Sequence, residues 1–181
     1  MSHAPAPALP ADEATLNAAM LRKAEHVLAL LHSASARVVT AESCTGGLVA
    51  AALTHFPGSS DMTEGGLVTY SNTMKKNLLG VPEATLAEHG AVSEPTVLAM
   101  AHGALLAAPL ARLSVSISGI AGPGGGSATK PVGLVWFAVA DRVGGIARAE
   151  SRIFSGSREQ VRLQAADHAL TMVADCLSAL V

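Results

Sequence analysis

The sequence predicts an α/β fold, a three-layer α/β/α sandwich with a mixed sheet of about five strands. Helical and strand-like segments alternate along the chain, a pattern typical of helices that cover both faces of a sheet. The last two strand-like segments are separated by a short Gly-containing turn, which favours a mixed sheet over an all-parallel one because parallel neighbours need a long crossover. Half of the 181 residues are hydrophobic, so the chain can bury a sizeable core.

The first helix is predicted over residues 13–32, where apolar residues recur at steps of three and four. A β-branched run at residues 37–41 predicts a strand. The glycines that follow predict a tight turn, and the composition of residues 48–56 favours a helix. A second strand is expected at residues 66–71, followed by a short helix at residues 72–79 that ends at a glycine.

The middle of the chain continues with helical patterns. A short helical segment is predicted at residues 82–89. Ser93 is expected to cap a helix that extends to about residue 108, since serine is a preferred N-cap residue. Glu94 would stabilise the positive end of that helix's dipole.

Three strands are then expected close together. Residues 113–120 and 132–140 are predicted strands, joined by a loop rich in Gly and Pro at residues 121–131. Residues 146–154 alternate as the third strand, in a hairpin that turns at Gly144-Gly145.

The last helix is expected over residues 158–180, because Ser157 and Gln160 form a capping-box pattern ahead of it. Residues 13–181 are predicted to form a single domain. The inner face of this helix is expected to carry Val161, Ala165, His168, Met172, Cys176 and Leu180.

The N-terminus and the cysteines indicate the cellular compartment of the protein. Residues 1–12 are rich in Ala and Pro and lack the basic and apolar regions of a signal peptide, which predicts a disordered leader. No apolar run approaches the ~20 residues of a membrane span. The two cysteines, Cys44 and Cys176, lie far apart without CxxC spacing, which favours a reduced, cytoplasmic protein.

Charge and composition exclude several classes of partner. The 12 Lys and Arg against 14 Asp and Glu give a net charge of −2, without the basic stripe that binding to a phosphate backbone requires. Trp136 and Tyr70 are the only residues of their kinds, too few for a base-stacking platform. No HExxH or HxH pattern occurs, so no metal site is predicted. We therefore expect neither a nucleic-acid partner nor a metal.

Three polar, Gly-containing segments lie at predicted strand ends, where open α/β sheets bind ligands: residues 42–47, 70–75 and 119–130. In the first, Ser43 sits on a turn directly before a helix, so backbone N–H groups can converge on an anion beside its hydroxyl. The alternative is that Ser43 or Thr45 only caps the helix. The substrate-binding residues predicted in this segment are Glu42, Thr45, Gly46 and Gly47.

A nucleophilic serine needs a base, and the histidines offer no obvious triad with Ser43. Lys75 shares a helix face with Leu78 and Leu79, so it is the lysine we expect to be buried. Burial would lower its pKa from about 10.4 towards neutrality. Tyr70 can hydrogen-bond either group. The alternatives are a surface lysine and a half-buried strand tyrosine.

Other residues near these segments leave alternatives open. Cys44 is a rival nucleophile, since a helix N-terminus stabilises a thiolate, or else a small packing residue. Arg158 places a cation near a helix N-terminus, which suits a phosphate, or else it is an exposed first-turn arginine. The Gly-rich loop either brings backbone amides to a substrate or only turns the chain. Its predicted binding residues are Gly119, Ala121 and Gly122.

Four motifs follow one another along the chain: TAESCTGG at residues 40–47, VTYSNTMK at 68–75, HGAVSEP at 89–95 and SGIAGPGGG at 118–126. Together with KPVGLVWFA at 130–138 and FSGSR at 154–158, they resemble the CinA C-terminal domain family. The likeness extends over nearly the whole chain after the leader.

The resemblance implies hydrolysis of the carboxamide of nicotinamide mononucleotide to nicotinic acid mononucleotide and ammonia, a step of pyridine nucleotide salvage. It implies that Ser43 is the nucleophile, Lys75 the base, Tyr70 a supporting hydroxyl and Arg158 a site arginine. It implies no cofactor, and a homo-oligomer, with a dimer favoured. The alternative is a nucleotide-binding sensor, or a recombination-associated domain, without turnover.

Overall fold

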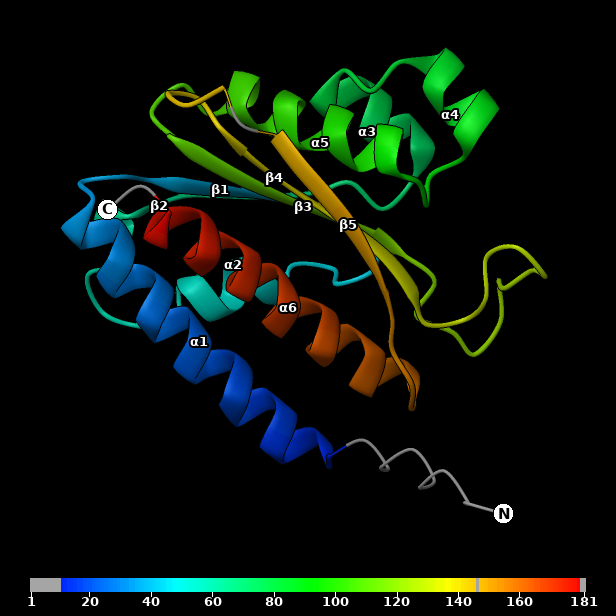
Figure 1. The fold of residues 1–181 in the computed structure, drawn as a ribbon, viewed down its shortest axis with the longest axis horizontal. Coiled ribbons are helices and arrows are strands. Elements are labelled where there is room, and N and C mark those ends of the chain that lie inside the picture. The colour runs from blue at the N-terminus through cyan, green and yellow to red at the C-terminus, as the bar shows by residue number, and fades with distance from the viewer. Residues whose placement is uncertain (1–10, 146, 180–181) are drawn as a thin grey trace.

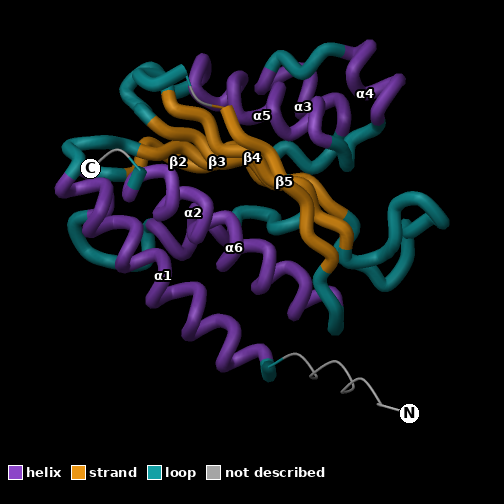
Figure 2. The backbone as a smooth tube through the Cα atoms, in the orientation of Figure 1, coloured by secondary structure: helices purple, strands orange, loops and turns teal. Residues whose placement is uncertain are grey.

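The computed structural model describes residues 11–145 and 147–179. Helices α1, α2 and α6 cover one face of a central sheet, and α3, α4 and α5 cover the other (Figure 1). The strands form one twisted layer between them (Figure 2). The three-layer sandwich with a five-stranded sheet is therefore confirmed. The elements are α1 (Glu13–Ser33), β1 (Val38–Glu42), α2 (Leu48–Leu53), β2 (Thr63–Val68), α3 (Asn72–Leu79), α4 (Glu83–His89), α5 (Glu94–Ala107), β3 (Leu113–Gly119), β4 (Leu134–Asp141), β5 (Ala147–Ile153) and α6 (Arg158–Ser178).

The sheet is mixed, with strand order β2-β1-β3-β4-β5. Strand β1 pairs in parallel with β2 and β3, whereas β4 pairs antiparallel with β3 and β5. Glu42, the last residue of β1, lies level with Val68 of β2 and Ile117 of β3. The carboxyl ends of three parallel strands therefore meet at one edge of the sheet, which is where such folds bind ligands.

Alternation along the strands supplies two apolar layers. Val38 of β1 belongs to the hydrophobic cluster under α1, α2 and α6, and Val39 to the cluster under α5, because successive strand residues point to opposite faces. Strand β3 alternates in the same way, with serines towards α5. The hydroxyl oxygens of Ser114 and Ser116 donate to the carbonyls of Ala101 and Val97, at 2.8 and 2.6 Å, so α5 lies directly on the sheet.

Strand β2 ends earlier than the sequence predicted. It covers Thr63–Val68, not residues 66–71, because Ser71 instead caps α3 by accepting from the amide of Met74. Gly66 lies inside the strand, where an added Cβ would come within 2.5 Å of the Cβ of Ala50. The glycine therefore lets α2 pack closely against the sheet.

Other boundaries agree closely with the sequence. The capping box of Ser157 and Gln160 is present, and Ser93 caps α5. Helix α2 is shorter than predicted, since it ends at Leu53, and the hydroxyl of Thr54 bonds back to the carbonyl of Ala50. Residues 1–10 of the leader predicted at 1–12 lie outside the described residues, as do Ile146, in the last predicted strand, and Leu180. The last residue of that leader, Asp12, caps α1 by accepting from the amide of Thr15.

Two further findings concern helices. Helices α1 and α6 lie side by side across the same face of the sheet (Figure 1). Among the residues that the structure describes, no helix is both long and apolar enough to span a membrane.

Candidate active site

Ser43 sits on a rigid turn at the carboxyl end of β1. Its amide donates to the carbonyl of Ile117 at 3.0 Å, which extends the pairing of β1 with β3 by one residue. Its carbonyl accepts from the amide of Gly46 at 3.0 Å, which closes the turn. Gly46 and Gly47 have φ values of 64° and 98°, a left-handed conformation that glycine adopts readily. The serine side chain is therefore presented by fixed backbone.

Lys75 of α3 reaches this serine. Its Nζ lies 3.0 Å from Oγ of Ser43 and donates to the carbonyl of Thr69 at 2.8 Å. The residue is only 1% exposed, and burial lowers the pKa of its amine from 10.5 to about 8. The predicted burial of Lys75 is confirmed, although Leu78, placed on the same face, is exposed.

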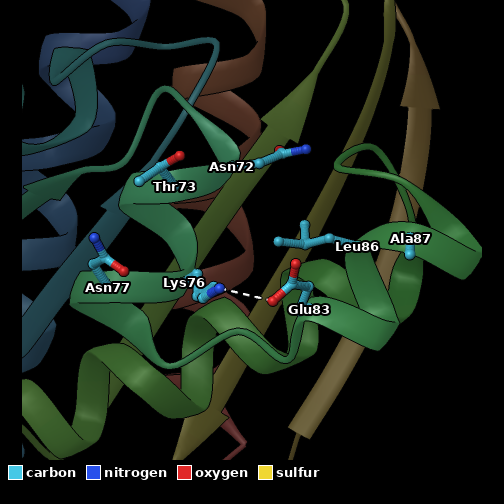
Figure 3. Close-up of a pocket in the computed structure, with 7 residues that line it drawn as sticks. All are labelled: Asn72, Thr73, Lys76, Asn77, Glu83, Leu86 and Ala87. Carbon is cyan, nitrogen blue, oxygen red and sulfur yellow. Dashed lines mark hydrogen bonds and ion pairs between the residues drawn. The ribbon is translucent and has the colours of Figure 1, made fainter.

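The neighbouring lysine has a different environment. Lys76 points into a surface pocket between α3 and α4, where its Nζ pairs with a carboxylate oxygen of Glu83 at 2.7 Å (Figure 3). Its side chain is 51% exposed. Of the two adjacent lysines, only Lys75 therefore faces Ser43 from a buried position.

Tyr70 and Arg158 meet at the rim of the Ser43 pocket. An Nη2 of Arg158 donates to the hydroxyl of Tyr70 at 3.1 Å, and its Nη1 donates to the carbonyl of Gly122 at 2.7 Å. Tyr70 is 63% exposed. The arginine thus links the end of β2, the Gly-rich loop and the start of α6.

The pocket brings together six of the predicted site residues: Ser43, Lys75, Tyr70, Arg158, Gly119 and Ala121. It has a volume of about 180 Å³. Glu42, Thr45, Gly46, Gly47 and Gly122 do not line it. Gly122 contributes indirectly, through the carbonyl that accepts from Arg158.

Glu42 contacts the protein's own backbone. It is fully buried, and its carboxylate accepts from the amides of Gly47 at 2.9 Å, Val49 at 3.2 Å and Ala50 at 2.9 Å. A carboxylate at a helix N-terminus satisfies amides that have no partner within the helix. The Gly47 amide is therefore occupied by Glu42, and the Gly46 amide by the carbonyl of Ser43, so neither is free to bind an anion at Ser43.

Two other amides of the turn are left over. Within the described residues, the N–H groups of Cys44 and Thr45 have no hydrogen-bond acceptor. Cys44 lines the pocket, whereas Thr45 is fully buried beside it. Burial raises the pKa of the Cys44 thiol to about 11, which favours a protonated packing residue over a thiolate nucleophile.

The sequence did not single out four residues near the site. Ala91, Val92 and Ser118 line the pocket, and all three belong to motifs already noted at residues 89–95 and 118–126. The fourth, Arg162, binds the Ser43 turn from α6. Its i, i+4 spacing from Arg158 was the available signal, since such residues share a helix face.

Acidic, cysteine and histidine side chains are the usual metal ligands in proteins. Among residues 11–145 and 147–179, no three of them are placed so that they could hold a metal ion.

Comparisons with known proteins show which sequences and structures the chain resembles. A family model described as the CinA C-terminal domain matches residues 21–177. The Escherichia coli (strain K12) protein named nicotinamide-nucleotide amidohydrolase PncC is 56% identical over 152 residues, or 83% of this chain and 90% of that one. The crystal structure of competence/damage inducible protein CihA from Agrobacterium tumefaciens matches with a TM-score of 0.83 and 41% identity, over 94% of this chain and 99% of that one. A CinA superfamily protein from Klebsiella pneumoniae matches with a TM-score of 0.84 and 38% identity, over 88% and 98% of the two chains.

Proposed function

Because the chain belongs to the CinA C-terminal domain family, we propose that it hydrolyses the carboxamide of nicotinamide mononucleotide, as part of pyridine nucleotide salvage. The products are nicotinic acid mononucleotide and ammonia. The observation that carries the proposal is the 3.0 Å separation between Nζ of Lys75 and Oγ of Ser43. The name of the E. coli relative supplies the substrate. No metal or organic cofactor takes part in the proposed reaction.

The first step is activation of the serine. With a pKa of about 8, an appreciable fraction of Lys75 is neutral near pH 7, and the neutral amine can accept the Ser43 proton. The hydrogen bond that Nζ donates to the Thr69 carbonyl fixes the amine against the hydroxyl. As the proton moves to Nζ, Oγ attacks the carboxamide carbon and forms a tetrahedral intermediate.

In the second step the tetrahedral intermediate collapses and the C–N bond breaks. Its oxyanion accepts a hydrogen bond from the unpaired amide of Cys44, the residue that follows the nucleophile. Lys75 returns its proton to the leaving nitrogen, the C–N bond breaks, and ammonia departs from an acyl-enzyme. Water then attacks the ester, with Lys75 again as base, and releases the carboxylic acid and the free serine. One oxyanion donor contributes roughly 3 kcal/mol to such a barrier.

The size of the pocket indicates how a nucleotide would lie. A volume of about 180 Å³ is smaller than the about 300–1,000 Å³ typical of sites that enclose a whole ligand. We infer that the pyridine ring and carboxamide enter, while the ribose and phosphate stay at the rim. Arg158 and Tyr70 lie there, and a guanidinium suits a phosphate.

The test is to incubate the purified protein with nicotinamide mononucleotide and to measure ammonia and nicotinic acid mononucleotide together. Equal amounts of both products support the proposal. Tight binding of the nucleotide without release of ammonia would contradict it and support a nucleotide-binding sensor.

A further inference from the structure

The backbone groups of the Ser43 turn are held from two sides. Glu42 accepts from amides at the start of α2, as described above. Arg162 of α6 acts on the carbonyls: its Nε donates to Cys44 at 3.2 Å and its Nη2 donates to Thr45 at 3.0 Å. The remaining Nη1 is held by a carboxylate oxygen of Glu159 at 2.9 Å.

These contacts determine where the Cys44 amide points. Among the described residues, the Gly122–Pro123 bond is the single cis peptide, so the peptides of the turn are trans and each carbonyl points opposite to the N–H of its own peptide plane. Arg162 holds the Thr45 carbonyl, and thereby the peptide plane that carries the Gly46 amide. That amide donates to the carbonyl of Ser43. The peptide plane that carries the Cys44 N–H is therefore fixed in turn.

Arg162 also packs against Gly46 of the turn. A Cβ added to Gly46 would lie 3.4 Å from Nη2 of Arg162, so the guanidinium packs against a position without a side chain. Arg162 does not line the pocket. Its hydrogen bonds go to the backbone that carries the reacting groups and, on the other side, to Glu159.

We propose that Arg162 is a positioning residue, which acts through the turn to aim the Cys44 amide at the oxyanion formed on attack by Ser43. The proposal rests on the proposed function. It predicts that the loss of Arg162 weakens binding of the transition state and leaves binding of the substrate nearly unchanged, because the oxyanion exists only after attack.

The experiment compares Arg162→Met and Arg162→Lys with the wild type and with Arg148→Met, a control on β5 whose side chain is 56% exposed. For Arg162→Met we expect kcat for nicotinamide mononucleotide to fall about 10- to 100-fold with KM within about twofold. Arg162→Lys should recover part of the loss, because one ammonium can still donate to a carbonyl. Arg148→Met should match the wild type.

A second readout separates this inference from the substrate assignment. A fluorophosphonate labels an activated serine without any nucleotide, and its adduct on Ser43 can be followed by mass spectrometry. Labelling that slows about 10-fold in Arg162→Met supports the positioning role even if the wild type releases no ammonia from the nucleotide. Unchanged kcat and labelling rate in a folded Arg162→Met variant, or in Arg162→Ala if the first does not fold, would overturn it.

Discussion

Lys75 and Ser43 come from positions 32 residues apart and meet with Nζ 3.0 Å from Oγ, both in the protein interior. Each residue is also fixed by contacts of its own. The serine is fixed by the turn after β1 and the lysine by the carbonyl of Thr69. The pair is therefore arranged before a substrate arrives, which is the condition for a positioned base to act on a nucleophile.

Replacement of the nucleophile should stop the reaction. Ser43→Ala removes the attacking oxygen, so we expect kcat to fall at least about 10³-fold. Cys44→Ala should keep kcat within about threefold, because the amide remains and the thiol is protonated. Ammonia release under saturating nucleotide measures both. Loss of turnover in Cys44→Ala with full turnover in Ser43→Ala would transfer the nucleophilic role to the thiol.

The rate should rise with pH as Lys75 loses its proton. Because burial lowers the pKa of this amine to about 8, the neutral base is a minority below that pH and dominant above it. We expect kcat/KM to increase about tenfold per pH unit on the acid side and to level off above about pH 8. A profile that is flat between pH 6 and 9 would show that another group is the base.

Removal of the buried amine should stabilise the fold. The folded pKa lies below the unfolded one, so the unfolded chain binds more protons between about pH 8 and 10.5 and stability rises with pH there. At pH 7 the lowered pKa of Lys75 destabilises the folded state by about 3 kcal/mol relative to the unfolded chain. Lys75→Met loses two hydrogen bonds, worth about 1 kcal/mol each.

Urea unfolding of Lys75→Met should therefore give a free energy about 1–2 kcal/mol higher than that of the wild type at pH 7. At pH 10 this advantage should disappear, because Lys75 is then neutral in the folded wild type and only the loss of its two hydrogen bonds remains. Lys76→Met, on the exposed neighbour, serves as the matched control and should change stability little. A Lys75→Met variant that is less stable than the wild type at pH 7 would mean that the buried charge of Lys75 does not destabilise the folded state.

Arg158 should determine the preference for a phosphorylated substrate. A charged hydrogen bond contributes about 1.5–3 kcal/mol, so Arg158→Met should raise KM for nicotinamide mononucleotide about 10- to 100-fold. KM for nicotinamide riboside, which lacks the phosphate, should change much less. Equal losses on both substrates would indicate that Arg158 positions Tyr70 and does not bind the phosphate.

The position of Lys75 depends on backbone contact between α3 and α5. A Cβ on Gly103 would lie 1.9 Å from the carbonyl oxygen of Leu79, the last residue of α3. We expect Gly103→Ala to lower the free energy of unfolding by about 3 kcal/mol and to reduce kcat. Gly124→Ala, where no atom lies within 4 Å of the added Cβ, should change stability by less than about 0.5 kcal/mol. Thermal melting of both variants measures these changes in stability.

Most of the fold could be predicted from local patterns. Periodicity located α1 and α6, and the caps at Ser93 and Ser157 marked helix starts, because these signals lie within a few residues. The end of β2 was misplaced because Ser71 can continue a strand or cap a helix, and in the structure it caps α3.

The site was predicted in outline for a related reason. Residue type and motif order located Ser43 and Lys75, and the family match confirms the resemblance that the motifs indicated. Which amides stay unpaired depends on Glu42, whereas the carbonyls of the turn are held by Arg162, whose contact with the turn spans 118 residues of sequence. No local pattern reports such a contact. The expected dimer and the absence of a cofactor stay predictions.

The place of α6 in the chain has a consequence for synthesis on the ribosome. This helix supplies Arg158 to the rim of the pocket and Arg162 to the Ser43 turn, and it covers the apolar surface beside α1. It is translated after every other described element. The nascent polypeptide therefore carries its nucleophile and its base before α6 can complete the site, and until α6 packs, the apolar surface that it covers stays exposed to aggregation and to chaperones.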